Sequence, residues 1–355
     1  MRGGAPDGSR VLTTVFILVR IVRMDLPRTP ARPDHGRAVR RARTGLALTA
    51  AAALVLGGCA STPADDGRLS VLASFYPLQV VAAGVGGDRV SVDSLTPPGA
   101  EPHDLELSPA QVARLGAADL VVYLGEFQAA VDDAVQASPP ERALDAADVV
   151  ELLDAAAEEG AHEGEAHADE THEGETAEEH AEHGEHDPHF WLDPSRMPAL
   201  VEAVADELSD LDPEGADEYA ANAAALSERF TELDAAYETG LATCSSRVLV
   251  TSHAAFGYLA DRYDLEQVAV AGIDPEGEPS PARLAEIGEV IRSEGVTTVF
   301  FETLVSPKVA EALAADVGAT TAVLDPLEGL ADDSQDYFSI AESNLEALKV
   351  ALSCS

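Results

Sequence analysis

The feature that most constrains the fold is a regular alternation of short apolar runs with helical segments. RLSVLASF (68–75) is rich in β-branched and apolar residues, and YPLQVVAAGVGG (76–87) follows as a helix that ends at paired glycines. The same order continues with the strand RVSVDSL (89–95), a helix that begins at Ser108, and the strand DLVVYLG (119–125). Strands that alternate with helices predict a parallel sheet covered by helices, so we expect an α/β fold.

A second series of the same kind occupies the last third of the chain. Between the two series lies PEGADEYAANAAALSERFTELDAAYETGL (213–241), which at about 1.5 Å per residue would form a helix longer than about 40 Å. We therefore predict two α/β lobes, 69–211 and 244–355, each with a parallel-type sheet, joined by one long rigid helix in 212–243. The strands expected in the second lobe are RVLVTS (247–252), LEQVAVAG (265–272), VTTVFF (296–301) and TTAVLD (320–325).

The N-terminal region predicts export. A basic run, RAVRRAR (37–43), precedes a short apolar run and Cys59. The apolar run is shorter than the roughly 20 residues of a membrane span, so 1–58 is interpreted as a signal region. Residues 56–59 resemble the lipobox of a bacterial lipoprotein, with Cys59 lipidated and 59–68 as a linker; a chance cysteine is the alternative. Because Met24 restarts the chain before a complete signal, we place 1–23 upstream of the true start.

Charge excludes several classes of partner. The sequence has 64 acidic residues against 22 lysines and arginines, a formal charge of −42. Such a chain repels nucleic acid and gains nothing from anionic lipid, so its natural small partner is a cation.

Two cysteines remain besides Cys59. Outside the cytoplasm, Cys244 and Cys354 would tend to pair. A bridge across about 110 residues would stabilise the fold by about 4–5 kcal/mol in the loop-entropy view. Two separate buried thiols are the alternative.

A tract of histidine, glutamate and glycine interrupts the first lobe. It runs from about residue 157 to 187 and has almost no apolar residue larger than alanine, so we expect a disordered loop that captures metal weakly. We further expect that deleting Ala161 to His186 leaves one tight metal site but lowers capture under scarcity. Its histidines are His162, His167, His172, His180, His183 and His186.

Four other residues are candidate metal ligands, and three of them lie at or just after the ends of predicted strands. His103 follows the strand 89–95, His253 follows 247–252, and Asp325 ends 320–325. His189 begins the apolar stretch HFWL just after the acidic tract. Ligands of open α/β sheets bind beyond the carboxyl ends of the strands, and three imidazoles with a carboxylate suit four-coordinate Zn²⁺. Each residue alone has an ordinary structural role as its alternative.

These residues lie in four motifs that carry a family resemblance. In order along the chain, EPHDLELSP, DPHFWLDP, TSHAAFGYLA and LDPLEGL resemble the metal-binding signature of the zinc and manganese substrate-binding lipoproteins of ABC importers, the ZnuA-like or TroA-like family. The resemblance covers about 69–355. It implies His103, His189, His253 and Asp325 as ligands, an ABC permease and ATPase as partners, and a lipid anchor on the outer face of the cell membrane.

The third ligand favours zinc. Manganese members of the family usually carry glutamate where this chain has His253, and imidazole suits Zn²⁺ whereas Mn²⁺ favours carboxylate oxygen. Zinc members sometimes engage the carboxylate position weakly or replace it by water, so water is the alternative to Asp325 as the fourth ligand. Glu302, at the end of the strand 296–301, is expected to hold an imidazole from behind, with a surface acid as the alternative.

The sequence thus predicts a monomeric, extracytoplasmic zinc-transport lipoprotein and no enzyme. The alternatives are a manganese homologue, an extracellular metal buffer or adhesin, and an anchored zinc hydrolase. The hydrolase is disfavoured because the histidine after His162-Glu163 is His167, one residue too far for HExxH, and there is no GxSxG elbow.

Overall fold

The computed structural model describes residues 67–155, 186–332 and 334–355, which belong to the unit Pro63–Ser355. The predicted signal region and Cys59 lie outside the described residues. Within those three ranges, no helix combines the length and the apolar character that a membrane crossing requires.

The first sheet is parallel, as the alternation predicts, and its strand order is β2-β1-β3-β4. Helix α1 packs on it because its apolar residues recur at helical spacing: Leu78, Val81, Ala82 and Val85 are all buried. The strands are β1 (Leu69–Ala73), β2 (Val90–Ser94), β3 (Leu120–Tyr123) and β4 (Ala143–Asp145), and the helices are α1 (Tyr76–Gly86), α2 (Pro109–Leu115), α3 (Ala129–Ala137) and α5 (Met197–Leu211), with 3-10 turns at Gly87–Arg89 and Ala146–Asp148.

The second sheet repeats this construction with the order β10-β9-β7-β8, again all parallel. Helix α8 begins where the Ser280 hydroxyl accepts a hydrogen bond from the Arg283 backbone N–H, and ends at Gly295 with φ 68°. The elements are β7 (Val248–Thr251), α7 (Gly257–Arg262), β8 (Glu266–Ala269), α8 (Pro281–Glu294), β9 (Thr298–Phe301), α9 (Lys308–Val317), β10 (Thr320–Val323) and α10 (Tyr337–Ala351).

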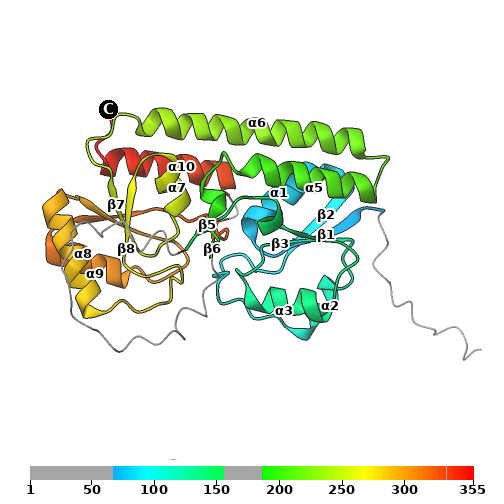
Figure 1. Cartoon of the computed structure of the whole chain (residues 1–355), viewed down its shortest axis with the longest axis horizontal. Coiled ribbons are helices and arrows are strands. Elements are labelled where there is room, and N and C mark those ends of the chain that lie inside the picture. The colour runs from blue at the N-terminus through cyan, green and yellow to red at the C-terminus, as the bar shows by residue number, and fades with distance from the viewer. Residues whose placement is uncertain (1–66, 156–185, 333) are drawn as a thin grey trace, which may run out of the picture. The chain divides into compact units, whose positions relative to one another are not determined.

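One long helix, α6 (Ala216–Leu241), runs past elements of both sheets (Figure 1). Near its start, Asn222 donates to the carbonyl of Val85 in α1; near its end, the Tyr237 hydroxyl donates to the carbonyl of Ala341 in α10. Its 26 residues span about 39 Å, slightly less than expected because the helix begins at residue 216 and not at 213.

Three short strands were not predicted from the sequence. β4 completes the first sheet, and β5 (Leu153–Asp154) pairs antiparallel with β6 (His186–Asp187). The predicted loop was expected to run to about residue 187, but its last two residues belong to β6, and Asp187 is fully buried. The tract therefore ends earlier than its composition indicated.

The two cysteines form a disulfide. Cys244, just beyond α6, is bonded to Cys354, just beyond α10, at a sequence separation of 110. The bridge ties together the ends of two helices that also pack side by side.

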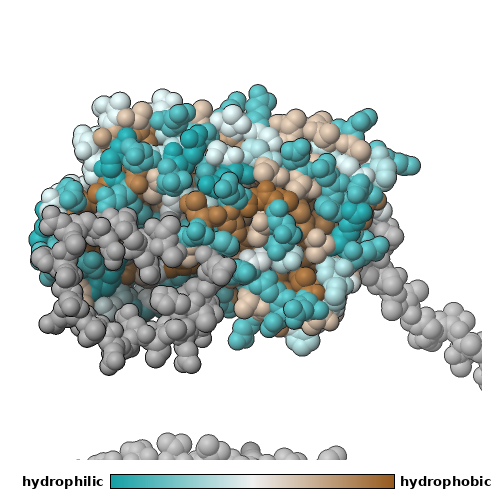
Figure 2. Space-filling view, in the orientation of Figure 1, coloured by the Kyte–Doolittle hydropathy of each residue, from teal (hydrophilic) through white to brown (hydrophobic). Residues whose placement is uncertain are grey.

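On the face shown in Figure 2, hydrophilic residues cover most of the surface, with smaller apolar areas between them.

Candidate metal centre

Three imidazoles and one carboxylate converge from four separate segments. His103 lies in the loop after β2, His189 directly precedes a 3-10 turn (Phe190–Leu192), and His253 follows β7. Glu328 lies in the loop after β10. One ligand atom from each of the four lies within 4.8 Å of all the others. The structure thus brings together the three histidines expected from the sequence.

The four donor atoms face one another. The Nε2 atoms of His103, His189 and His253 lie 3.5, 3.1 and 3.5 Å from Glu328 Oε1. Within the part of the chain that the structure describes, these nitrogens and both Glu328 oxygens are buried without hydrogen-bond partners. Buried polar atoms rarely stay unpaired. A dication at their common centre would satisfy all four, and this donor set fits tetrahedral Zn²⁺.

Two imidazoles are oriented by carboxylates on their other side. Asp187 Oδ1 lies 2.7 Å from Nδ1 of His189 and also accepts its backbone N–H at 2.9 Å. Glu302 Oε1 lies 2.8 Å from Nδ1 of His253, the contact that the sequence led us to expect. A carboxylate at Nδ1 holds the proton there and turns Nε2 toward the ligand position. Asp187 was missed because the sequence assigned it to the disordered tract.

The electrostatics of the cluster follow from this arrangement. Burial alone would lower the pKa of both imidazoles, but Asp187 and Glu328 raise the pKa of His189 to about 9, and Glu302 and Glu328 raise the pKa of His253 to about 10. Burial alone would raise the pKa of Glu328, but the three imidazoles hold it well below its usual value. In the metal-free cluster, Glu328 is therefore an ionised carboxylate beside the protonated rings of His189 and His253.

The His103 loop is fixed by its neighbours. The Glu101 carboxylate accepts the backbone N–H of His103 at 3.1 Å, and burial raises the pKa of Glu101. The buried amide of Gln128 donates to the carbonyl of Pro102 at 3.0 Å. The Phe127 ring lies edge-on to the His103 ring, with centroids 4.7 Å apart. These contacts hold the most exposed of the three imidazoles in place.

Asp325, which the sequence analysis assigned as the fourth ligand, does not join the cluster. Its Oδ1 accepts the backbone N–H of Leu327 at 2.8 Å, and its Oδ2 accepts the hydroxyl of Thr303 at 2.7 Å. The carboxylate that meets the imidazoles belongs to Glu328, three residues later in the same motif. The chain turns at Leu327, whose φ is 61°. Because of this turn, the Asp325 side chain faces Thr303 and the Leu327 backbone, whereas the Glu328 side chain faces the imidazoles.

Of the six auxiliary histidines predicted from the sequence, only His186 is among the described residues. His186 lies at the exposed start of β6, with Nδ1 3.3 Å from Asp154, and is not part of the buried cluster. The other five, His162, His167, His172, His180 and His183, lie outside the described residues.

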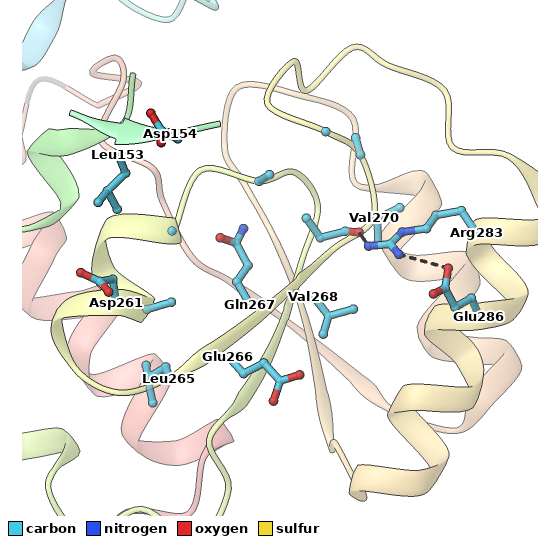
Figure 3. Close-up of a pocket in the computed structure, with 16 residues that line it drawn as sticks. Leu153, Asp154, Asp261, Leu265, Glu266, Gln267, Val268, Val270, Arg283 and Glu286 are labelled. Carbon is cyan, nitrogen blue, oxygen red and sulfur yellow. Dashed lines mark hydrogen bonds and ion pairs between the residues drawn. The ribbon is translucent and has the colours of Figure 1, made fainter. Parts of the chain in front are cut away.

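A separate cavity of about 650 Å³ runs along the edge strand β8 (Figure 3). Its wall includes Arg283, which donates to the carbonyl of Ala269 and pairs with Glu286, and Gln267, which donates to the carbonyl of His253. None of the described residues that line it is a histidine or a cysteine. Gln267 thus holds the backbone of one ligand, but the described residues that line the cavity offer no comparable set of nitrogen ligands.

Comparisons with known proteins agree with this geometry. The chain is 36% identical over 315 residues to the zinc-binding lipoprotein AdcA of Streptococcus pneumoniae, covering 86% of this chain but spanning 60% of that relative. It is 34% identical to the high-affinity zinc uptake system protein ZnuA of Bacillus subtilis, over 87% of this chain and 97% of that protein. The crystal structure of the Zn(II)-bound ZnuA-like domain of S. pneumoniae AdcA superposes with a TM-score of 0.65 at 34% identity, covering 81% of this chain and 99% of that domain. The family described as zinc-uptake complex component A, periplasmic, matches residues 71–351, and the chain belongs to this family.

Proposed function

We propose that this protein is the extracytoplasmic zinc-binding component of an ABC-type importer. It binds one Zn²⁺ through His103, His189, His253 and Glu328 and delivers the ion to a membrane permease. The observation that carries the proposal is a set of four buried donor atoms that face a common centre and have no hydrogen-bond partner among the described residues. The names of the relatives, which bind or take up zinc, support the choice of cargo.

The donor set favours zinc over manganese. Three neutral imidazole nitrogens and one carboxylate oxygen suit Zn²⁺, whereas Mn²⁺ is better served by more oxygen ligands. Asp187 and Glu302 strengthen this preference because a carboxylate at Nδ1 makes the opposite nitrogen a better donor. Both carboxylates are engaged with imidazoles, so neither is free to act as the general base of a hydrolase.

We further propose that the protein acts at the outer face of the cell membrane, together with an ABC importer. Cys59 would carry the lipid that anchors the chain at the outer face of the cell membrane, and the partners would be an ABC permease and its ATPase. Support comes from the lipobox at 56–59 and from the family, whose description is a component of a zinc-uptake complex. We propose that the protein acts as a monomer.

Metal analysis and titration test the proposal. The mature protein is purified, stripped of metal and titrated with Zn²⁺ and Mn²⁺ in competition with a chelator of known affinity. We expect one tight zinc site, weaker manganese binding, and a loss of at least about 100-fold in zinc affinity in His253→Ala, which removes a ligand and leaves its buried partners unpaired.

His186→Ala is the matched control, because it removes a described histidine that lies outside the buried cluster. Its tight zinc site should be unchanged. Wild-type protein that takes up no zinc, or a His253→Ala variant that binds zinc as well as wild type, would contradict the proposed function.

A further inference from the structure

We infer that Asp325 is a positioning residue for the zinc site: its carboxylate holds the turn that delivers Glu328 to the three imidazoles, without touching the ion itself. The inference rests on the proposed function and adds a determinant of affinity outside the four ligands.

Among the described residues, the polar contacts of the Glu328 carboxylate are with the three imidazoles, the other donors of the same site. Both of its carboxylate oxygens lack a hydrogen-bond partner among the described residues, and its contacts with the imidazole nitrogens span 3.1–3.5 Å. The backbone of the turn Asp325–Gly329 therefore has to bring this carboxylate to the rings. What fixes that backbone fixes the fourth ligand.

The turn contains a conformation that needs support. Leu327 has φ 61°, in the left-handed region that residues other than glycine rarely adopt. Its backbone N–H donates to Asp325 Oδ1 at 2.8 Å, and its side chain is buried. The Asp325 carboxylate thus stabilises the strained residue directly before Glu328.

Asp325 is itself anchored on both sides. The buried amide of Asn344 in α10 accepts the Asp325 backbone N–H at 2.9 Å and donates to its carbonyl at 2.7 Å. Thr303 donates to the second carboxylate oxygen at 2.7 Å. These hydrogen bonds fix the position of the carboxylate that accepts the Leu327 backbone N–H.

The far end of the turn is confined as well. The Trp191 indole N–H donates to the carbonyl of Pro326 at 2.7 Å. A Cβ atom on Gly329 would lie 3.1 Å from Leu304 Cδ1 and 3.3 Å from the carbonyl of Ala100. The loop has little room to move as a whole. Loss of the Asp325 contact should therefore change mainly the conformation of Leu327 and the position of Glu328.

The substitution that decides between positioning and ligation is Asp325→Asn. Asparagine keeps an oxygen that can accept from Leu327 N–H, and its amide can donate to the Thr303 hydroxyl, but it is a much poorer zinc ligand than a carboxylate. Positioning predicts zinc affinity within about 3-fold of wild type for Asp325→Asn, whereas Asp325→Ala, which removes the acceptor, should lose about 10–100-fold, as is typical when a residue that supports a ligand is removed.

Cobalt provides an independent readout of the ligand set. With saturating Co²⁺, Asp325→Asn and Asp325→Ala should show the visible absorption bands of wild type, because the four ligands are unchanged, while Glu328→Gln should shift them. Asp332→Ala is the matched control: its carboxylate also accepts a backbone N–H two residues on, from Ser334, but outside the turn. This control should bind zinc like wild type.

Each outcome is decisive. Bands in Asp325→Asn that shift like those of Glu328→Gln, or a zinc affinity that falls as far in Asp325→Asn as in Asp325→Ala, would make Asp325 a ligand and overturn the inference. Unchanged affinity in Asp325→Ala would overturn it as well. If Asp325→Ala does not fold, the asparagine variant alone decides. Failure of wild type to bind zinc would remove the proposed function instead, so the two failures are distinguishable.

Discussion

At the scale of single residues, His189 and His253 each use the two nitrogens of one ring for different purposes. Nδ1 faces a carboxylate, and Nε2 faces the centre of the cluster. The same carboxylates that aim the ring also raise its pKa, so at neutral pH the metal-free rings hold protons that an incoming cation must displace. Orientation is thus coupled to proton release.

Zinc binding should therefore release protons. With pKa values of about 9 for His189 and about 10 for His253, both rings are protonated at pH 7.5, and we expect about two protons released per zinc. Apparent affinity should rise with pH between about 6.5 and 8.5, since the proton concentration that opposes binding falls. Calorimetry in buffers of different ionisation enthalpy measures the release.

Glu302→Gln is the matched variant for this prediction. It removes the carboxylate that most raises the pKa of His253, so fewer protons should be released at pH 7.5. Equal heats in all buffers, which would mean no proton release, would contradict the account.

Individual ligands were predictable to different degrees. The three histidines follow strands or begin a buried apolar stretch, and strand ends converge in an α/β fold whatever the details of the loops. The carboxylate was not predictable in this way, because Asp325 and Glu328 belong to one short loop, and a single left-handed residue decides which of them faces the imidazoles. The available hint was Glu328 itself, a second acid within LDPLEGL.

At the scale of elements, the strands and helices with clear periodicity were predicted from the sequence, because each pairs an apolar run with a recognisable start or stop. The strands that were missed, β4, β5 and β6, have only two or three residues, too few for any period to appear. Their tertiary setting creates them: β6, for example, places Asp187 behind His189.

The end of α1 gives a test of packing between elements. A Cβ on Gly86 would lie 2.1 Å from Cγ2 of the stiff side chain of Val90, whereas a Cβ on Gly84 would meet the flexible end of Leu226 at 2.8 Å. Gly86→Ala should lower the free energy of unfolding by about 1–3 kcal/mol. Gly84→Ala should be neutral or stabilising by up to about 1 kcal/mol, because alanine favours the helix. Denaturant unfolding of both variants checks this; equal effects would contradict the packing described here.

The disulfide gives a second test at this scale. Replacing Cys244 and Cys354 by serine should lower the free energy of unfolding by about 4–5 kcal/mol, since the bridge closes a loop of 110 residues in the unfolded chain. Zinc affinity should be unchanged, because neither cysteine supports a ligand of the cluster. A variant as stable as wild type in urea would show that the bridge contributes nothing.

At the scale of the whole molecule, the cluster is assembled from the two series of strands and helices that α6 spans. His103 and His189 come from the first series, and His253 and Glu328 come from the second. The lobe boundaries at 211–212 and 243–244 stay predictions, but the cluster requires both series to be folded. Metal binding should therefore stabilise the fold as a whole.

Two deletions that differ by one residue test where the histidine-rich tract ends. Removing Ala161–His186 should leave the tight zinc site, because Asp187 remains behind His189. Removing Ala161–Asp187 should weaken it by about 10–100-fold, since the ring then loses its orienting carboxylate. Chelator competition measures both, and equal affinities would mean that Asp187 is dispensable.

Trp191 is the single tryptophan of the sequence, and its ring centre lies 5.2 Å from that of His189. A protonated imidazole beside an indole quenches its fluorescence, and zinc would replace that proton. Trp191 fluorescence should therefore report zinc binding directly: emission excited near 295 nm should increase as the ion binds. Stopped-flow mixing could then measure the rates of zinc binding and release without an attached dye.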